Sequence, residues 1–378
     1  MFPQQEDQAG LVGRSDFVYP TNMTYLNTAS VGPSPKAVLD RMVETWHLIE
    51  SSPVAESYAR GTDRLDEVRQ KIGSFLNCDK EDVVFTACTS DAMSRLAFGL
   101  ALQPGDHIVT TDQEHEGGHD CWKFHARARG VEVEDIAIGL DERDPDAIVS
   151  RFAKAIKPKT RAISFSHVLY TNGLRLPAAE LCELARSRGV ISIVDGAQAV
   201  GNIAVDIAKI GCDAYAAPGH KWLLGPKGTG FMVVSRAAAP RLELLTRLTD
   251  TKAQNDTTGL ANHMGFQGLA AAIDYVNRIG MPKIERHNLE LHAYAYDRIQ
   301  SLPVKTLSPR DGVVAAPLLA FTLDGKFDIP KLIPALLAEE NLVVKGLRKL
   351  GGLRLSTHFF NTQADVDRAV AILKRRLA

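Results

Sequence analysis

Apolar residues follow two alternating patterns along the chain from about residue 60 onward. Short apolar runs are typical of buried strands, whereas apolar residues that recur every three or four positions predict helices. The predicted strands are 83–85, 107–110, 131–133, 162–165, 190–194, 214–217 and 230–234. Because these strands alternate with helices, such as those predicted over 91–100 and 177–188, the pattern predicts an α/β fold with a mainly parallel sheet.

The pattern changes after about residue 250. A long helical pattern from 268 to 279 and beyond precedes two predicted strands, 318–322 and 352–356, and a final helix, 362–377. This order is typical of a smaller α+β domain. We therefore predict three parts: an N-terminal arm (1–24) that packs with the small domain, a large domain (25–250) and a small C-terminal domain (251–378).

Composition narrows the class of protein. The chain has 378 residues, 45% of them apolar, and a net charge of −1, so a large core is expected and a nucleic-acid partner is not. Five scattered cysteines without a CxxC pair favour a reducing compartment. We find no apolar run of about 20 residues and no signal-peptide pattern at the N-terminus. A cytoplasmic protein without a membrane segment is expected.

An aspartate and a lysine stand just after two predicted strands. Asp195 ends the run 190–194, and Lys221 follows 214–217 in the sequence Gly-His-Lys-Trp. Ligands of parallel sheets bind where strands end. Pyridoxal phosphate (PLP) needs a lysine for a Schiff base and a carboxylate that keeps its ring nitrogen protonated. The pair therefore predicts a PLP site, where burial would lower the pKa of the lysine and Gln198 would reach the ring hydroxyl.

Two further segments can contribute to such a site. Thr89 and Ser90 begin the helix after the strand 83–85, where hydroxyls and free N–H groups favour a phosphate, although an ordinary helix cap needs the same residues. Arg354 lies between leucines on a predicted strand. Its planar guanidinium suits a substrate carboxylate, and a structural ion pair is the alternative.

The sequence His115-Glu116-Gly-Gly-His119, with a further histidine at position 125, has the spacing of a zinc-protease site. Two glycines in the middle of a helix would disfavour that site, at a cost of about 1 kcal/mol each. His115 directly follows a strand and could instead stack on a cofactor ring. A zinc metallohydrolase is therefore the alternative from a different class.

Taken together, these motifs resemble the class V aminotransferase family of PLP enzymes of fold type I, over nearly the whole chain. The matching segments include 25–29, 88–91, 114–115, 195–198, 219–222 and 354–356. The resemblance implies a large domain with a mainly parallel sheet, a smaller α+β domain and a homodimer with active sites at the subunit interface. It is nearest in character to isopenicillin N epimerase-like and cystine C–S lyase-like members.

The resemblance also implies a role for each matching residue. Lys221 would bind the cofactor and move protons, Asp195 would pair with the ring nitrogen, and His115 would stack on the ring. Gln198 would contact the ring oxygen. The phosphate would be held by Thr89, Ser90, His220 and, from the partner subunit, Thr258. The amino-acid substrate would be bound by Arg354 and Asn27.

The chain departs from the family pattern in ways that bear on the reaction. Tyr170 replaces an asparagine of the desulfurase branch, and Pro218 replaces a hydroxylated residue. No cysteine follows Cys212, so the loop that carries a persulfide in desulfurases is missing. We expect chemistry at Cα through an external aldimine, by C–S β-elimination or epimerisation. A true aminotransferase with a keto-acid acceptor and a catalytically silent scaffold remain alternatives.

Overall fold

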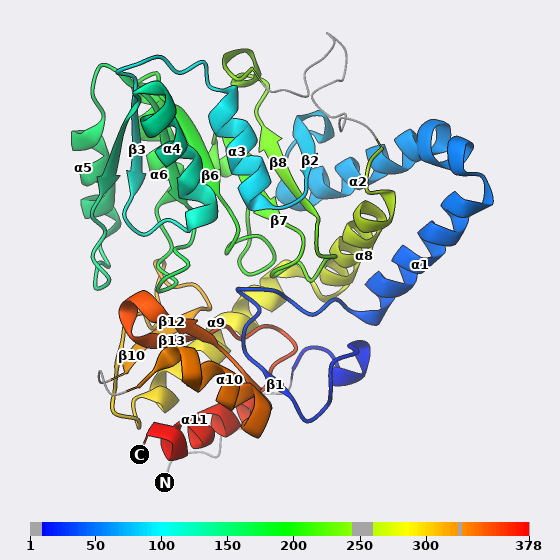
Figure 1. Cartoon of the computed structure of the whole chain (residues 1–378), viewed down its shortest axis with the longest axis vertical. Helices are drawn as coiled ribbons and strands as arrows, with labels where there is room; N and C mark the ends of the chain where they lie inside the picture. Colours follow the sequence, from blue (N-terminus) through cyan, green and yellow to red (C-terminus); the bar gives the residue numbers. More distant parts are fainter. Residues whose placement is uncertain (1–9, 244–259, 324–326, 378) are drawn as a thin grey trace.

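The computed structural model describes residues 10–243, 260–323 and 327–377 (Figure 1). Two features of the sequence lie outside these residues: Thr258 and the predicted boundary between residues 250 and 251. The division into three parts therefore stays a prediction.

A seven-stranded sheet forms the centre of the upper part of the molecule in Figure 1. Its strand order is β2-β8-β7-β6-β5-β3-β4, and the five strands from β7 to β4 are parallel, whereas β8 runs antiparallel to both β7 and β2. The strands are β2 (Val83–Thr86), β3 (His107–Thr111), β4 (Glu132–Ile136), β5 (Thr160–Ser166), β6 (Ile191–Asp195), β7 (Ala214–Pro218) and β8 (Gly230–Val234). The predicted mainly parallel α/β fold is confirmed.

Helices cover both faces of this sheet, so most of its strands are buried on both sides, whereas the edge strand β4 is partly exposed. One face packs against α2 (Arg60–Leu76), α5 (Pro145–Ala155), α6 (Ala178–Ser187), α7 (Ile207–Ile210) and α8 (His263–Ile279). The other face packs against α3 (Thr89–Gly99) and α4 (Glu116–Arg129). Although α8 follows residue 250, it contributes Phe266 and Leu269 to the core of the large sheet.

A four-stranded antiparallel sheet lies below the large sheet in Figure 1, in the order β12-β13-β10-β9. Its strands are β9 (Val304–Thr306), β10 (Leu319–Leu323), β12 (Lys345–Leu347) and β13 (Gly352–Leu355). Leu353 and Leu355 pack into a core with α9 (Met281–Ile299), α10 (Ile329–Glu340) and α11 (Gln363–Leu377). Because side chains alternate along a strand, Arg354 points away from that core.

The N-terminal segment packs beside this smaller sheet. The short strand β1 (Thr24–Tyr25) pairs in parallel with β11 (Leu342–Val343), and the backbone N–H of Leu11 donates to the carbonyl of Phe359. Beyond β1, α1 (Lys36–Ser51) and the π-helical turn η2 (Ala55–Ala59) lead into α2. The described residues include the 3₁₀ turns η1 (Arg14–Asp16), η3 (Lys80–Asp82), η4 (Ala239–Arg241) and η6 (Arg348–Leu350).

Candidate active site

The predicted site residues that the structure describes gather at the carboxyl ends of the parallel strands, on the side that faces the smaller sheet. Asp195 is the last residue of β6, and Lys221 follows the neighbouring strand β7. Charges couple Lys221 to Asp195 and to His115: the charge of Asp195 raises the pKa of Lys221, and the charge of Lys221 lowers that of His115. The topology thus unites three side chains that are up to 106 residues apart in the sequence.

Lys221 is a packed lysine. Burial lowers the pKa of its amine to about 8, and the nearby positive charge of Arg354 acts in the same direction, while Asp195 opposes both. The adjacent Trp222 is fully buried, which fixes the backbone of this loop. A lysine in this setting presents a free amine near neutral pH, which an aldehyde requires.

Asp195 is buried, and burial raises the pKa of its carboxyl. The backbone N–H of Ala197 donates to Oδ1 at 2.8 Å, which opposes that shift, as does the positive charge of Lys221. Oδ2 faces the start of α4, where a Cβ on Gly118 would come within 3.0 Å of it. This oxygen needs a cationic partner, and a protonated ring nitrogen would supply one.

Gln198 is held in one orientation by two hydrogen bonds. Its Oε1 accepts from Nε1 of Trp222 at 2.8 Å, and its Nε2 donates to the carbonyl of Ala29 at 3.0 Å. The carbonyl of Trp222 is itself bonded to Nε2 of His358 at 2.8 Å. The tryptophan after Lys221 therefore positions the amide that was predicted to reach the ring oxygen.

Polar atoms without partners mark the predicted phosphate end of the site. Within the described residues, Oγ1 of Thr89 and Nδ1 of His220 are buried and make no hydrogen bond. Thr89 and Ser90 form the first turn of α3, whose cap residue Cys88 makes no side-chain cap bond. Buried polar atoms normally have partners, and a helix N-terminus favours an anion, so these residues fit a phosphate group.

His115 caps the N-terminus of α4: its Nδ1 accepts from the backbone N–H of Gly117 at 3.0 Å. Burial and the charge of Lys221 lower the pKa of its ring, which favours the neutral form. The ring packs edge-on against Tyr170, with centroids 5.1 Å apart. A Cβ on Gly117 would overlap Oγ of Ser90. The paired glycines therefore let α4 approach the first turn of α3 closely.

Arg354 is a buried cation that no acidic side chain of the described residues neutralises. It is 2% exposed, and burial lowers its pKa to about 10. It donates to the carbonyl of Tyr170 at 2.8 Å and to Oγ of Ser30 at 3.2 Å, and its Nε has no partner among the described residues. Nearby, Oδ1 of Asn27 is also buried without a hydrogen bond in that part of the chain. An anionic ligand would satisfy this arrangement.

The structure does not assemble the zinc alternative. His119 bonds to Asp135 at 2.7 Å, Glu116 pairs with Lys349 at 2.9 Å, and His125 is buried among aromatic rings. Across the described ranges, no three His, Cys, Asp or Glu side chains come together in a way that could hold a metal ion. The expectation that the two glycines would lie mid-helix is wrong: they form the first turn of α4 after the capping histidine.

Glu114 is a site residue to which the sequence analysis gave no role. Its carboxylate accepts from Oγ1 of Thr111 at 2.7 Å and from the backbone N–H of Ser166 at 3.0 Å, and Oγ of Ser166 donates to it as well. Burial raises its pKa to about 7, with a further contribution from the charge of Asp195. Since Ser166 is the register partner of Asp195, Glu114 braces the strand end that carries this aspartate.

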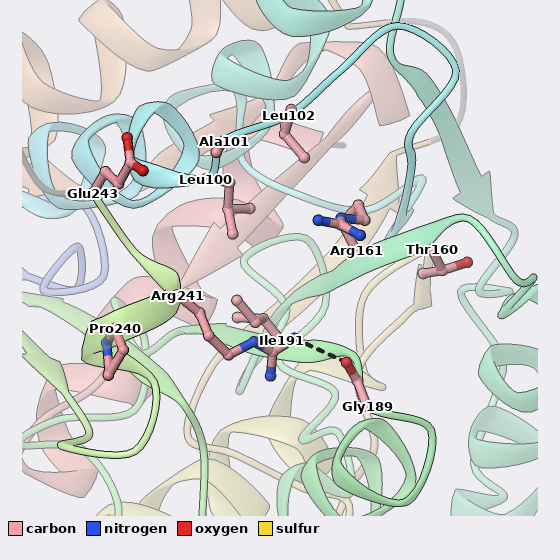
Figure 2. Close-up of a pocket in the computed structure, with 10 residues that line it drawn as sticks. All are labelled: Leu100, Ala101, Leu102, Thr160, Arg161, Gly189, Ile191, Pro240, Arg241 and Glu243. Atoms are coloured by element: carbon pink, nitrogen blue, oxygen red, sulfur yellow. Dashed lines mark hydrogen bonds between the residues drawn. The ribbon is translucent and has the colours of Figure 1, made fainter.

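A separate cavity of about 410 Å³ lies at the other end of the parallel strands, where they begin (Figure 2). It is bordered by the first residues of β5 and β6, Thr160 and Ile191, whereas the candidate site lies where these strands end. Arg241 donates to the carbonyl of Gly189 at 2.8 Å in this cavity, as Figure 2 shows. The cavity is not part of the candidate active site.

The fold matches solved structures along almost its whole length. An apo cysteine desulfurase from Thermococcus onnurineus superimposes with a TM-score of 0.86 at 25% identity, covering 96% of this chain and 97% of that one. The cystine C–S lyase C-DES, in complex with its reaction product cysteine persulfide, has a TM-score of 0.84 at 23% identity, covering 94% and 98%. The structure thus has the fold of type I PLP-dependent enzymes, as predicted.

Sequence comparison gives the family. The aminotransferase class-V model matches residues 24–369, and the chain belongs to this family. An isopenicillin N epimerase from Amycolatopsis lactamdurans is 30% identical over 93% of this chain and 94% of its own. A probable cysteine desulfurase from Methanothermobacter thermautotrophicus is 28% identical over 94% of each. The chain is a PLP-dependent enzyme, and the predicted resemblance to the epimerase and C–S lyase branches is confirmed.

Proposed function

We propose that this enzyme removes the α-proton of a sulfur-containing amino acid and releases the β-sulfur substituent, as a C–S lyase. The observation that carries the proposal is the amine of Lys221, whose pKa is lowered by desolvation to about 8 at a centre shared with Asp195 and Arg354. The lowered pKa increases the neutral fraction of this amine near physiological pH, and the neutral amine can accept a proton from Cα and return it later. When bound, PLP withdraws electrons from Cα and so makes that proton acidic.

The other site residues bind and orient. We propose that Arg354 and Asn27 bind the α-carboxylate of the substrate, since both present buried polar atoms without partners among the described residues. Asp195 faces the ring nitrogen and Gln198 the ring oxygen. The phosphate is held by Thr89, Ser90 and His220, and His115 covers one face of the ring. Thr258 of the partner subunit completes the phosphate site in this proposal.

Elimination is favoured over a sulfur relay because no cysteine follows Cys212 in the sequence. The chain therefore lacks a thiol in the segment before Arg354 that could accept a persulfide, and the sulfur product leaves in free form. Elimination also needs a single base, which Lys221 supplies.

Epimerisation is the second candidate, and the 30% identity to an isopenicillin N epimerase over 93% of the chain favours it. Epimerisation requires that a proton be returned to the opposite side of Cα. His115 and Tyr170, whose rings are in contact, are the residues that we assign to this step in an epimerase.

Product analysis separates these reactions. The holoenzyme is incubated in D₂O with cystine, cysteine and a panel of other amino acids, with and without a keto acid. Pyruvate and a sulfur product without an acceptor support elimination, and a deuterated enantiomer supports epimerisation. Turnover that depends strictly on the keto acid would show an aminotransferase and overturn the proposal.

We further propose a cytoplasmic homodimer with active sites at the interface. Five large apolar side chains are exposed along α1 and the turn that follows it: Val43 (54%), Trp46 (59%), Leu48 (42%), Val54 (74%) and Tyr58 (64%). A second copy of the chain would cover them. The five cysteines, all free thiols, fit a reducing compartment. No helix in the described ranges combines the length and apolar character needed to cross a membrane.

The test of the dimer is the mass of the holoenzyme in solution. Wild-type protein is expected to sediment as a dimer, and Trp46→Asp is expected to shift it toward monomer. A monomeric wild type at micromolar concentration would contradict the proposal.

A further inference from the structure

A second cation lies beside the buried arginine of the smaller sheet. Lys345 on β12 is the register partner of Arg354 on β13. Paired residues on neighbouring strands point to the same face of a sheet, with Cβ atoms about 5 Å apart. Like charges placed directly opposite each other are destabilising, so this pair needs an explanation.

The alternation along β12 fixes the side on which Lys345 lies. Gly346 faces α10, because a Cβ there would lie 2.6 Å from Ile329 and 3.0 Å from Ile333. Lys345 therefore points to the opposite face, which is the face that Arg354 shares and that looks toward the large sheet. Arg354 is buried, whereas Lys345, on the edge strand of the smaller sheet, is exposed.

The charges around this pair are not balanced by acids. Lys345 forms no ion pair with an acidic side chain of the described residues, and partial desolvation together with the charges of Arg354 and Arg348 lowers its pKa. The next lysine along the chain, Lys349, differs: its charge is paired with Glu116 at 2.9 Å. Within the described residues, the ammonium group of Lys345 and the guanidinium of Arg354 thus lie on neighbouring strands, and neither has an acidic partner.

We propose that the substrate is an amino acid with a second acidic group, whose α-carboxylate binds Arg354 and whose distal anion binds Lys345. The proposal rests on the proposed function, which places the α-carboxylate at Arg354. Two separated cations suit two separated anions, and each contact is a charge-assisted hydrogen bond. An amino acid with an uncharged side chain would leave Lys345 without its partner.

The test compares amino acids that differ only in the distal charge. The holoenzyme is titrated with aspartate and asparagine, with glutamate and glutamine, and with S-carboxymethylcysteine and its side-chain amide. Dissociation constants are read from the change in cofactor absorbance, which needs no turnover. In at least one pair the acidic member is expected to bind about three- to tenfold more tightly, as for a partly exposed ion pair.

Variants assign that preference to one side chain. Lys345→Gln is expected to abolish it without weakening the uncharged member, and Lys345→Glu is expected to reverse it. Lys374→Gln is the control, because this exposed lysine belongs to α11, which packs on the other face of the sheet. Lysines on edge strands also discourage strand pairing, and if that were the only role, Lys345→Gln would leave the preference intact.

The outcomes keep the two proposals apart. No preference in any pair, or a preference that survives Lys345→Gln, overturns the assignment of the distal anion. If no amino acid changes the absorbance, the proposed function fails instead.

Discussion

The amine of Lys221 is expected to titrate near pH 8 in the cofactor-free protein. At pH 7, a lysine with this pKa is neutral in about one molecule in eleven, whereas a lysine at the ordinary value of 10.5 is neutral in about one in 3,000. The packing around Lys221 thus raises the reactive fraction by about 300-fold. Its cause is burial, with the charges of Arg354 and Asp195 acting in opposite directions.

Two variants test this cause through the sign of the change. Asp195→Asn removes the charge that raises the pKa of Lys221, so the midpoint is expected to fall. Arg354→Gln removes a charge that lowers the pKa, so the midpoint is expected to rise. The assay is competitive labelling of cofactor-free protein with a trace of amine reagent across about pH 6–11, a range that includes both the lowered and the ordinary pKa of a lysine. The labelled peptides are quantified by mass spectrometry, with the exposed Lys374 as the internal reference.

A wild-type midpoint near 10.5, or a shift of both variants in the same direction, would contradict this prediction. A midpoint near 8 that neither variant moves would leave burial as the only cause.

Three further predictions concern the surroundings of the site. Glu114→Gln removes a carboxyl whose pKa is raised to about 7. A raised carboxyl pKa contributes stability to the fold at low pH, and this contribution is lost as the pH rises through 7. Between about pH 4 and 8, the free energy of unfolding of the variant should therefore gain up to about 3 kcal/mol relative to wild type in denaturant titrations. Gly196→Ala places a methyl group against the buried ring of Tyr215 and should lower the free energy of unfolding by about 1–3 kcal/mol, whereas an unchanged midpoint would contradict this packing. Trp222→Phe removes the donor that orients Gln198 and should weaken PLP binding several-fold in equilibrium dialysis; unaltered affinity would show that the amide needs no such support.

The sequence alone predicts most of the sheet well because its strands other than β4 are almost entirely buried. Such strands appear as short apolar runs, and β8 was predicted with its observed bounds, 230–234. The antiparallel direction of β8 could not be predicted, because a short apolar run looks the same in either direction. The packing of α8 against the large sheet was also beyond the sequence, since a helical period does not say which core the helix joins.

The residues of the site also differ in whether the sequence could predict them. Asp195 and Lys221 could be predicted because both stand at the ends of recognisable strands. The contribution of Glu114 could not, because its hydrogen-bonding partner Ser166 lies 52 residues further along and becomes adjacent only through strand pairing. The glycines after His115 illustrate the opposite error. They suggested an interrupted helix, yet they allow the close approach of α4 to Ser90 and Asp195.

PLP is expected to be linked to Lys221, and borohydride reduction of the coloured holoenzyme followed by peptide mapping is the decisive experiment. The account predicts that the visible band disappears and that the mass of a pyridoxyl group is found on the peptide that contains Lys221. A pyridoxyl group on another lysine, such as Lys227 or Lys345, or a coloured Lys221→Ala variant that still incorporates the label, would contradict it.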